Sequence, residues 1–207
     1  MWLPWDKQMG TIETYLLSRP WLPTLLWVVL YTSDYYLTIW GSKLYRRQKF
    51  IEMEGSYELT AEFQDDINKQ KLVSGNLLMW LTAGAVILLV TGYLIGGPLY
   101  LYGVLVGFLV FVELGVHTRH FRNIVQFWRL GTSNPGASGH IKMARDGTYQ
   151  LSSVQSAGWA VLTLAAFALT NSPILLGGGL RFGLLACQHL LLSRRRANST
   201  AATEEET

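Results

Sequence analysis

Five apolar stretches, each about 20 residues long, limit what this chain can fold into. They are 22–41, 76–95, 98–116, 151–171 and 173–193. A helix needs about 20 residues to cross about 30 Å of hydrocarbon. Charged residues make up 15% of the chain, whereas soluble domains carry about 25%. We therefore predict an all-α, polytopic helix bundle that crosses a membrane five times.

The basic residues are divided unequally among the segments that join these stretches. Fourteen lysines and arginines lie in 42–75, in 117–150 and after residue 193, whereas two, Lys7 and Arg19, precede the first stretch. Cytoplasmic loops of membrane proteins carry an excess of Lys and Arg. We expect a plasma (inner) membrane protein with its N-terminus outside, its C-terminus in the cytoplasm, and 42–75 and 117–150 as cytoplasmic loops. A four-span arrangement would place these basic loops on opposite sides.

The two ends of the chain differ in character. Apolar residues recur at helical spacing before residue 20, and tryptophans flank them. The apolar residues are Met9, Ile12, Leu16 and Leu17, and the tryptophans are Trp2, Trp5 and Trp21. This pattern is typical of an amphipathic helix at the membrane surface. We expect one membrane domain over 1–197 and a disordered polar tail over 198–207.

Two short elements are expected in the loops. Leu59, Phe63 and Ile67 recur every four residues, which predicts a short helix with an apolar stripe. Further on, Asp146-Gly147 is a dipeptide favoured in two-residue turns, and it predicts a β-hairpin over 140–152.

Asp34 lies near the middle of the first apolar stretch. A carboxylate at the bilayer centre costs at least ~2.5 kcal/mol, so it normally faces protein or water and marks an ion or proton site. Thr38 falls on the same helix face one turn later. The alternative is a structural carboxylate that is bound to a neighbouring helix. A pair between Asp34 and Arg181, the charged residue of the last stretch, would explain both residues.

Glu113, His117 and His120 share one helix face at the end of the third stretch, because they are spaced i, i+4 and i+7. A carboxylate and two imidazoles can bind Zn²⁺, Fe²⁺ or Mn²⁺, or can relay protons. The alternative is an interfacial helix in which Glu113 pairs with Arg119 or Arg122. No further cofactor is expected.

The residues that follow alternate between basic and apolar. They include Arg119, Phe121, Arg122, Trp128 and Arg129. Such a segment is expected to lie on a membrane surface and bind anionic lipid headgroups, after a bend at Gly115. Because membrane topology accounts for the basic residues, we expect no nucleic-acid partner.

Small residues within the spans predict close helix packing. Gly103 and Gly107 are four residues apart, as are Gly179 and Gly183, and this spacing lets backbones approach each other within one chain or between copies. The single cysteine, Cys187, is expected to pack as a small apolar residue.

The run Ser33-Asp34-Tyr-Tyr-Leu-Thr38, followed by Glu58-Leu59-Thr60, resembles a pattern in small uncharacterised prokaryotic membrane proteins. These proteins have Asp-x-x-x-Thr in an early span and a Glu-x-Asn-Pro-like segment after it. The resemblance covers about thirty residues and departs from the pattern at Thr60-Ala61, where Asn-Pro is expected. It singles out Asp34, Thr38 and Glu58 and implies no particular activity.

These features favour a small oligomeric channel or transporter for ions, protons or small solutes. Its pathway would use Asp34, Thr38, Glu113, His117, His120 and Arg181. An alternative is a structural or assembly subunit of a larger membrane complex. A third is an enzyme with a metal on Glu113, His117 and His120, although the chain has no nucleotide-binding or nucleophile motif.

Overall fold

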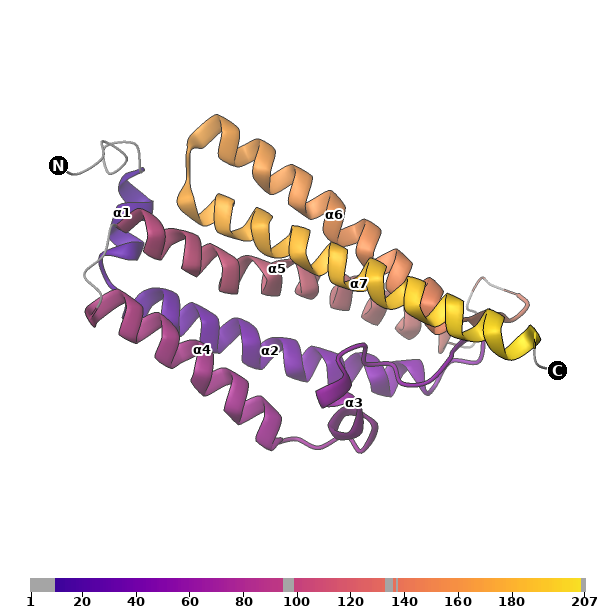
Figure 1. Ribbon diagram of the computed structural model, residues 1–207. Coiled ribbons are helices and arrows are strands. Elements are labelled where there is room, and N and C mark those ends of the chain that lie inside the picture. Colours follow the sequence, from indigo (N-terminus) through magenta and orange to yellow (C-terminus); the bar gives the residue numbers. More distant parts are fainter. Residues whose placement is uncertain (1–9, 95–98, 133–135, 137, 206–207) are drawn as a thin grey trace.

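The computed structural model describes residues 10–94, 99–132, 136 and 138–205 (Figure 1). Helices form most of this part of the chain. The helices are α1 (Thr11–Leu17), α2 (Trp21–Tyr45), α3 (Ala61–Asn68), α4 (Gly75–Leu94), α5 (Leu99–Leu130), α6 (Arg145–Thr170) and α7 (Pro173–Glu205). The strands are β1 (Ile51–Met53) and β2 (Ile141–Met143).

Four of these helices, α4 to α7, are long and apolar enough to cross a membrane. The protein is thus an integral membrane protein built from helices, as predicted. The fifth predicted span, 22–41, is not confirmed. It lies within α2, which is 25 residues long but carries Asp34 and several hydroxyl groups in place of a uniformly apolar surface.

The helices form a bundle around α5 (Figure 1). α5 packs against α2 on one side and α7 on the other, α4 covers α2, and α6 covers α7. α1 and the joint between α6 and α7 lie at one end of the bundle, which we call the α1 end. α3 and the two strands lie at the other, which we call the α3 end.

The predicted surface helix at the N-terminus is not confirmed. α1 has seven residues, and its Leu17 is 1% exposed within the bundle core, whereas Ile12 is exposed. Glu13 accepts hydrogen bonds from the Ser172 hydroxyl (2.7 Å) and the Ile174 amide (3.3 Å), which join α1 to the start of α7. Trp2, Trp5 and Met9 lie outside the described residues.

α5 continues through Leu130, well past the predicted end of the third span at 116. The helix is unbroken at Gly115, where a bend is expected, and the Phe182 ring of α7 packs where a β-carbon of Gly115 would be. Beyond it, Ile124 and Phe127 are buried against Leu44 of α2. Most of the predicted loop 117–150 is therefore helical.

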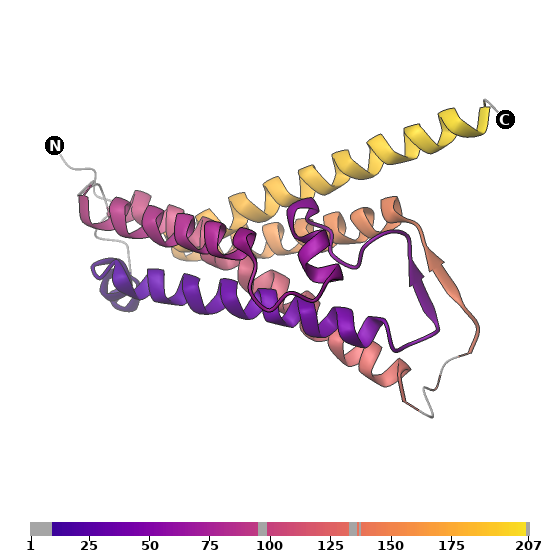
Figure 2. The ribbon, with the colours of Figure 1, turned by 90° about the horizontal axis from the view of Figure 1, so that it is seen from below.

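The predicted hairpin over 140–152 is wrong. β2 pairs in parallel with β1, with Ile51 opposite Ile141 and Met53 opposite Met143 (Figure 2). Asp146 and Gly147 lie in the first turn of α6 instead of in a hairpin turn. β2 therefore pairs with β1, from the loop between α2 and α3, in preference to forming a local hairpin.

Two further segments can be compared with the prediction. α3 forms where the stripe of Leu59, Phe63 and Ile67 predicts a helix, and Ile67 is 1% exposed. At the other end, α7 continues to Glu205, over most of the stretch 198–207 for which disorder is expected.

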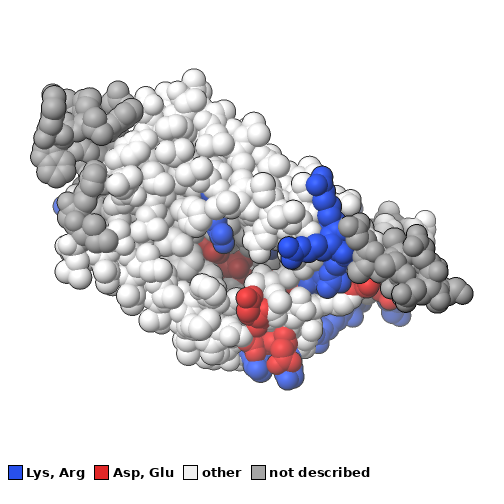
Figure 3. All heavy atoms as spheres, in the orientation of Figure 1, with Lys and Arg blue, Asp and Glu red and all other residues white. Residues whose placement is uncertain are grey.

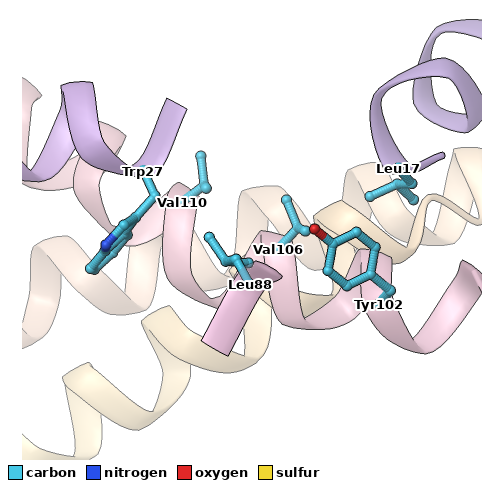
Figure 4. Packing of buried hydrophobic residues seen from close by; sticks show 6 residues of the cluster. All are labelled: Leu17, Trp27, Leu88, Tyr102, Val106 and Val110. Carbon is cyan, nitrogen blue, oxygen red and sulfur yellow. The ribbon is translucent and has the colours of Figure 1, made fainter. Parts of the chain in front are cut away.

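An apolar cluster closes the bundle at the α1 end (Figure 4). It consists of Leu17, Trp27, Leu88, Tyr102, Val106 and Val110. Beside it the backbones of α5 and α7 come close together, because a β-carbon on Gly107 would overlap the carbonyl of Ile174 and one on Gly177 would overlap that of Val104. The close contact between these helices fixes their relative positions along the site described next.

Candidate functional site

A cavity of about 460 Å³ lies inside the bundle, between α2, α4, α5 and α7. Its lining changes in character from one end to the other. Aromatic and aliphatic residues such as Trp27, Ile87 and Phe108 line it toward the α1 end, whereas Arg119 and His120 line it toward the α3 end. Figure 3 shows acidic and basic atoms within a hollow surrounded by uncharged residues, and further charged residues gather on the same face toward the α3 end.

Three potential metal ligands converge at this cavity. One ligand atom each from Asp34, Glu113 and His117 lies within 4.8 Å of the other two. Asp34 comes from α2, whereas Glu113 and His117 come from consecutive turns of α5. The tight packing of α2 on α5 thus adds a carboxylate to the pair that the sequence places on one helix face.

His117 is oriented by its own helix and by α2. Its Nδ1 lies 2.6 Å from the backbone carbonyl of Glu113, which can only accept, so Nδ1 carries the proton. The Ser33 hydroxyl lies 2.7 Å from Nε2. Ser33 Oγ also lies 2.9 Å from the Leu30 carbonyl, so its one proton serves either that carbonyl or Nε2. In the neutral ring the Nε2 lone pair faces Ser33, and a metal ion on Nε2 would take the place of this hydroxyl. Metal-binding histidines are commonly oriented by such a backbone hydrogen bond on the other nitrogen.

His120 is placed to orient Asp34. Its Nε2 lies 3.0 Å from Asp34 Oδ1 and 3.1 Å from Thr38 Oγ1. The Thr38 hydroxyl donates to the backbone carbonyl of Asp34 (2.9 Å), so its oxygen accepts from His120. The three residues thus form one network in which His120 donates toward the carboxylate, and His120 lies outside the group of converging ligands.

Glu113 is 7% exposed, and its Oε2 has no hydrogen-bond partner among the described residues. The predicted pair between Glu113 and Arg119 or Arg122 is absent from them as well, because no arginine nitrogen lies within 4.0 Å of this carboxylate. Burial of an ionised carboxylate without a partner is costly, and proteins avoid it with a proton or a cation.

Arg181 lines the same cavity, but it does not pair with Asp34. Its guanidinium lies 5.2 Å from the centre of the Phe108 ring. Arg119 lines the cavity closer to the α3 end and contacts the Ser152 hydroxyl at 3.4 Å. Within the described part of the chain, neither guanidinium has a carboxylate within 4.0 Å.

His189 of α7 also lines the cavity, and sequence reasoning missed it. Its side chain is buried, its Nδ1 has no hydrogen-bond partner among the described residues, and its ring lies 5.6 Å from that of Tyr149. A histidine within an apolar span is itself a signal of function, and this signal could have identified it.

Asp34, Thr38 and Glu58, the residues that the family resemblance singles out, all line this cavity. Glu58 is held by its own loop, where its Oε1 accepts from the Thr60 amide at 2.7 Å. The resemblance itself is not tested by this placement.

A second cavity, of about 430 Å³, lies at the α3 end between α5, α6 and the strands. It shares Glu58, Leu59, Arg119 and His120 with the first, so these four residues stand between the two. Arg122 lines only the second cavity.

The remaining predicted site residues fall into two groups. Phe121 and Trp128 are exposed, as are Arg122 and Arg129, so this part of α5 presents a mixed basic and apolar surface. Among the glycines, Gly103 faces Pro173 and Gly179 faces Leu164, whereas Gly183 faces open space. Cys187 is exposed on α7 instead of buried in the core.

Comparison of the chain with protein-family models, curated proteins and solved structures returned no match.

Proposed function

We propose that the protein is a metal-dependent membrane enzyme whose divalent cation is held by Asp34, Glu113 and His117. The observation that carries this proposal is the convergence of the three ligand atoms within 4.8 Å at a largely buried position. Two carboxylates and one imidazole are a donor set suited to Mn²⁺, Fe²⁺ or Zn²⁺.

The electrostatics of the site support a cation. Two carboxylates that face each other in a medium of low dielectric constant repel, so they share a proton or bind a positive ion. Glu113 Oε2 is buried and lacks a hydrogen bond among the described residues, whereas Asp34 Oδ1 contacts only His120 Nε2, at 3.0 Å. In this arrangement, His120 would be a positioning residue that orients Asp34. A bound cation would act as a Lewis acid.

The shape of the cavity favours an enzyme over a channel. Ions that cross the bundle within one chain would have to pass the apolar cluster that contains Trp27, Leu88 and Val106 at the α1 end. Reactants that come from the lipid or from the α3 end reach the polar residues without passing it. Because a single chain encloses the cavity, this function does not require an oligomer.

Transport of a cation or of protons is the second candidate. The observation that favours it is the second cavity, which shares His120 and Arg119 with the first and extends the polar lining toward the α3 end. In a transporter, the cluster at the α1 end would have to open.

For the topology, we propose that α2 is the fifth span and that the α3 end is cytoplasmic. A helix of 25 residues is about 37 Å long, which suffices to cross the hydrocarbon core. Its polar residues Asp34 and Thr38 face the cavity instead of lipid. The basic residues near the α3 end then lie on the side that the positive-inside rule predicts.

Thermal unfolding in detergent, measured with and without Mn²⁺ or Zn²⁺, tests the cation site. A ligand at 100 times its dissociation constant stabilises the folded state by about 2.7 kcal/mol. We expect a higher melting temperature for the unmodified protein and little or no increase for Glu113→Gln and His117→Ala.

His140→Ala and Glu52→Gln are the matched controls, because both side chains are exposed and lie outside the cavity. Both variants should respond to the metal as the unmodified protein does. An equal response in Glu113→Gln would refute the site. Reconstituted vesicles then separate the two functions. Metal-dependent chemical modification of the vesicle lipids supports an enzyme, whereas uptake of cations or protons into the vesicles supports a transporter.

A further inference from the structure

We infer that the cavity binds one membrane lipid with an anionic headgroup, which enters sideways between α4 and α7. This inference rests on the proposed function in one respect, because it names the substrate class of the same cavity. The binding itself does not require the cation, so the two proposals can fail separately.

The side of the cavity formed by α4 is apolar and reaches the outer surface. Trp80 and Ile87 line the cavity, yet each is 46% exposed. Both residues thus form part of the thin wall between the cavity and the surface, and charged atoms are visible from outside in the hollow of Figure 3, so the cavity opens on the long side of the bundle. In a membrane that side faces lipid tails, and Figure 3 shows the hollow on this face.

The two arginines in the cavity form no direct ion pair, although both are near enough to interact electrostatically with Glu113. Arg181 and Arg119 line it without a carboxylate within 4.0 Å among the described residues. Arginine binds phosphate in a bidentate manner, and charge-assisted hydrogen bonds are strong in a site that excludes water. The free guanidiniums therefore complement a phosphate-bearing headgroup.

The cavity has an apolar part and a polar part, arranged like the tail and the headgroup of a lipid molecule. Residues of the cavity toward the α1 end, including Phe108, Leu109 and Ile87, suit an acyl chain. Residues toward the α3 end, including Arg119 and His120, suit a headgroup. Arg181, whose guanidinium lies 5.2 Å from the centre of the Phe108 ring, stands at the boundary between the two parts. Glu113, between the two, would then place the proposed cation next to the junction of headgroup and tail.

Native mass spectrometry of the purified protein tests this inference. The protein would be mixed with equal amounts of phosphatidylglycerol and phosphatidylcholine that carry the same acyl chains. We expect one phosphatidylglycerol per chain to survive gentle activation. Removing a charge-assisted hydrogen bond weakens binding by ~10- to 100-fold, and we expect this loss in Arg181→Gln.

Two other variants make the result specific. Arg129→Gln removes an exposed arginine that does not line the cavity and should retain the lipid. Ala83→Trp fills the cavity from α4 while leaving Arg181 intact and should lose the lipid. The melting temperature of each variant shows whether it is folded.

Three results would overturn the inference. They are equal retention of the two lipids, unchanged retention in folded Arg181→Gln, and displacement of the lipid by millimolar inorganic phosphate, which would indicate a site for a free anion. The metal titration uses the same preparation. Lipid retention without a metal response therefore refutes the cation site alone, and a metal response without lipid retention refutes this inference alone.

Discussion

Arg145 connects the start of α6 to the loop that carries Glu58. Its side chain is 5% exposed and donates to the carbonyls of Ser56, Glu58 (2.8 Å) and Leu59 (3.3 Å). Its backbone amide donates to Glu54 Oε2 at 3.1 Å. One guanidinium thus satisfies three carbonyls of a segment that forms part of the cavity wall.

Arg145→Met should therefore loosen the loop 54–60 more than the rest of the protein. Leaving buried carbonyls without donors costs about 1–3 kcal/mol. Hydrogen exchange is expected to increase in 54–60 and to stay unchanged in the middle of α5. If hydrogen exchange in 54–60 is the same in Arg145→Met as in the unmodified protein, Arg145 does not hold this loop.

Asp66 joins α3 to the start of α4. Its carboxylate accepts from Lys71 Nζ (2.6 Å) and from the Ser74 hydroxyl (2.6 Å), while Ser74 Oγ accepts from the Leu77 amide. These hydrogen bonds, first that from Lys71 and then that from Ser74, lower the pKa of Asp66 below its ordinary value of 3.8.

Because the pKa is lower in the folded state, Asp66 stabilises the protein above pH 3.8 and loses this contribution as the pH falls through its folded value. Asp66→Asn should melt at a lower temperature at pH 7, and the difference from the unmodified protein should shrink below pH 4. A difference that is constant with pH would contradict this role.

At the residue scale, helical spacing was sufficient to predict that Glu113 and His117 share a face. It could not predict that Asp34 joins them, because the rotation of α2 relative to α5 depends on tertiary packing. His189 was missed although its position within an apolar span is a local signal. The predicted pair between Asp34 and Arg181 is replaced by the contact between Asp34 and His120.

At the scale of helices, the contact between α5 and α7 depends on glycine. A β-carbon on Gly107 would overlap the carbonyl of Ile174, whereas one on Gly183 would meet nothing within 4 Å. The two glycines lie on neighbouring helices, and each can be replaced by alanine. They therefore form a matched pair.

Gly107→Ala should lower the free energy of unfolding by about 1–3 kcal/mol, because overpacking forces the two backbones apart. Gly183→Ala should be neutral or slightly stabilising, since alanine favours a helix by up to about 1 kcal/mol over glycine. Denaturation in a mild detergent measures both. Equal effects of the two variants would show that α5 and α7 can separate at no cost.

Sequence patterns predicted the long helices well, because a membrane-spanning segment is a local property of about 20 residues. They predicted α5 and the strands poorly. The end of α5 and the pairing of β1 with β2 depend on partners that are distant in the sequence, Leu44 of α2 and the loop at 51–53. The turn dipeptide at Asp146 was a weaker determinant than these contacts.

At the scale of the whole molecule, the proposed five-span topology predicts which residues share a side of the membrane. With Cys187→Ser as background, cysteines placed at Lys69 and Lys142 should react with an impermeant maleimide only after the membrane is opened. A cysteine at Ser172, at the α1 end, should react in intact cells. Ser18 is exposed and precedes α2, so a cysteine there should also react in intact cells. Reaction of Ser18→Cys only after the membrane is opened, as for Lys69→Cys, would refute α2 as a span.

X-ray absorption spectroscopy of the protein loaded with Zn²⁺ tests the cation site most directly. We predict one ion per chain with a first shell of oxygen and nitrogen that includes a single imidazole, from His117, and no imidazole in His117→Ala. The absence of a stoichiometric ion, or a shell without imidazole in the unmodified protein, would contradict the assignment of Asp34, Glu113 and His117 as the metal site.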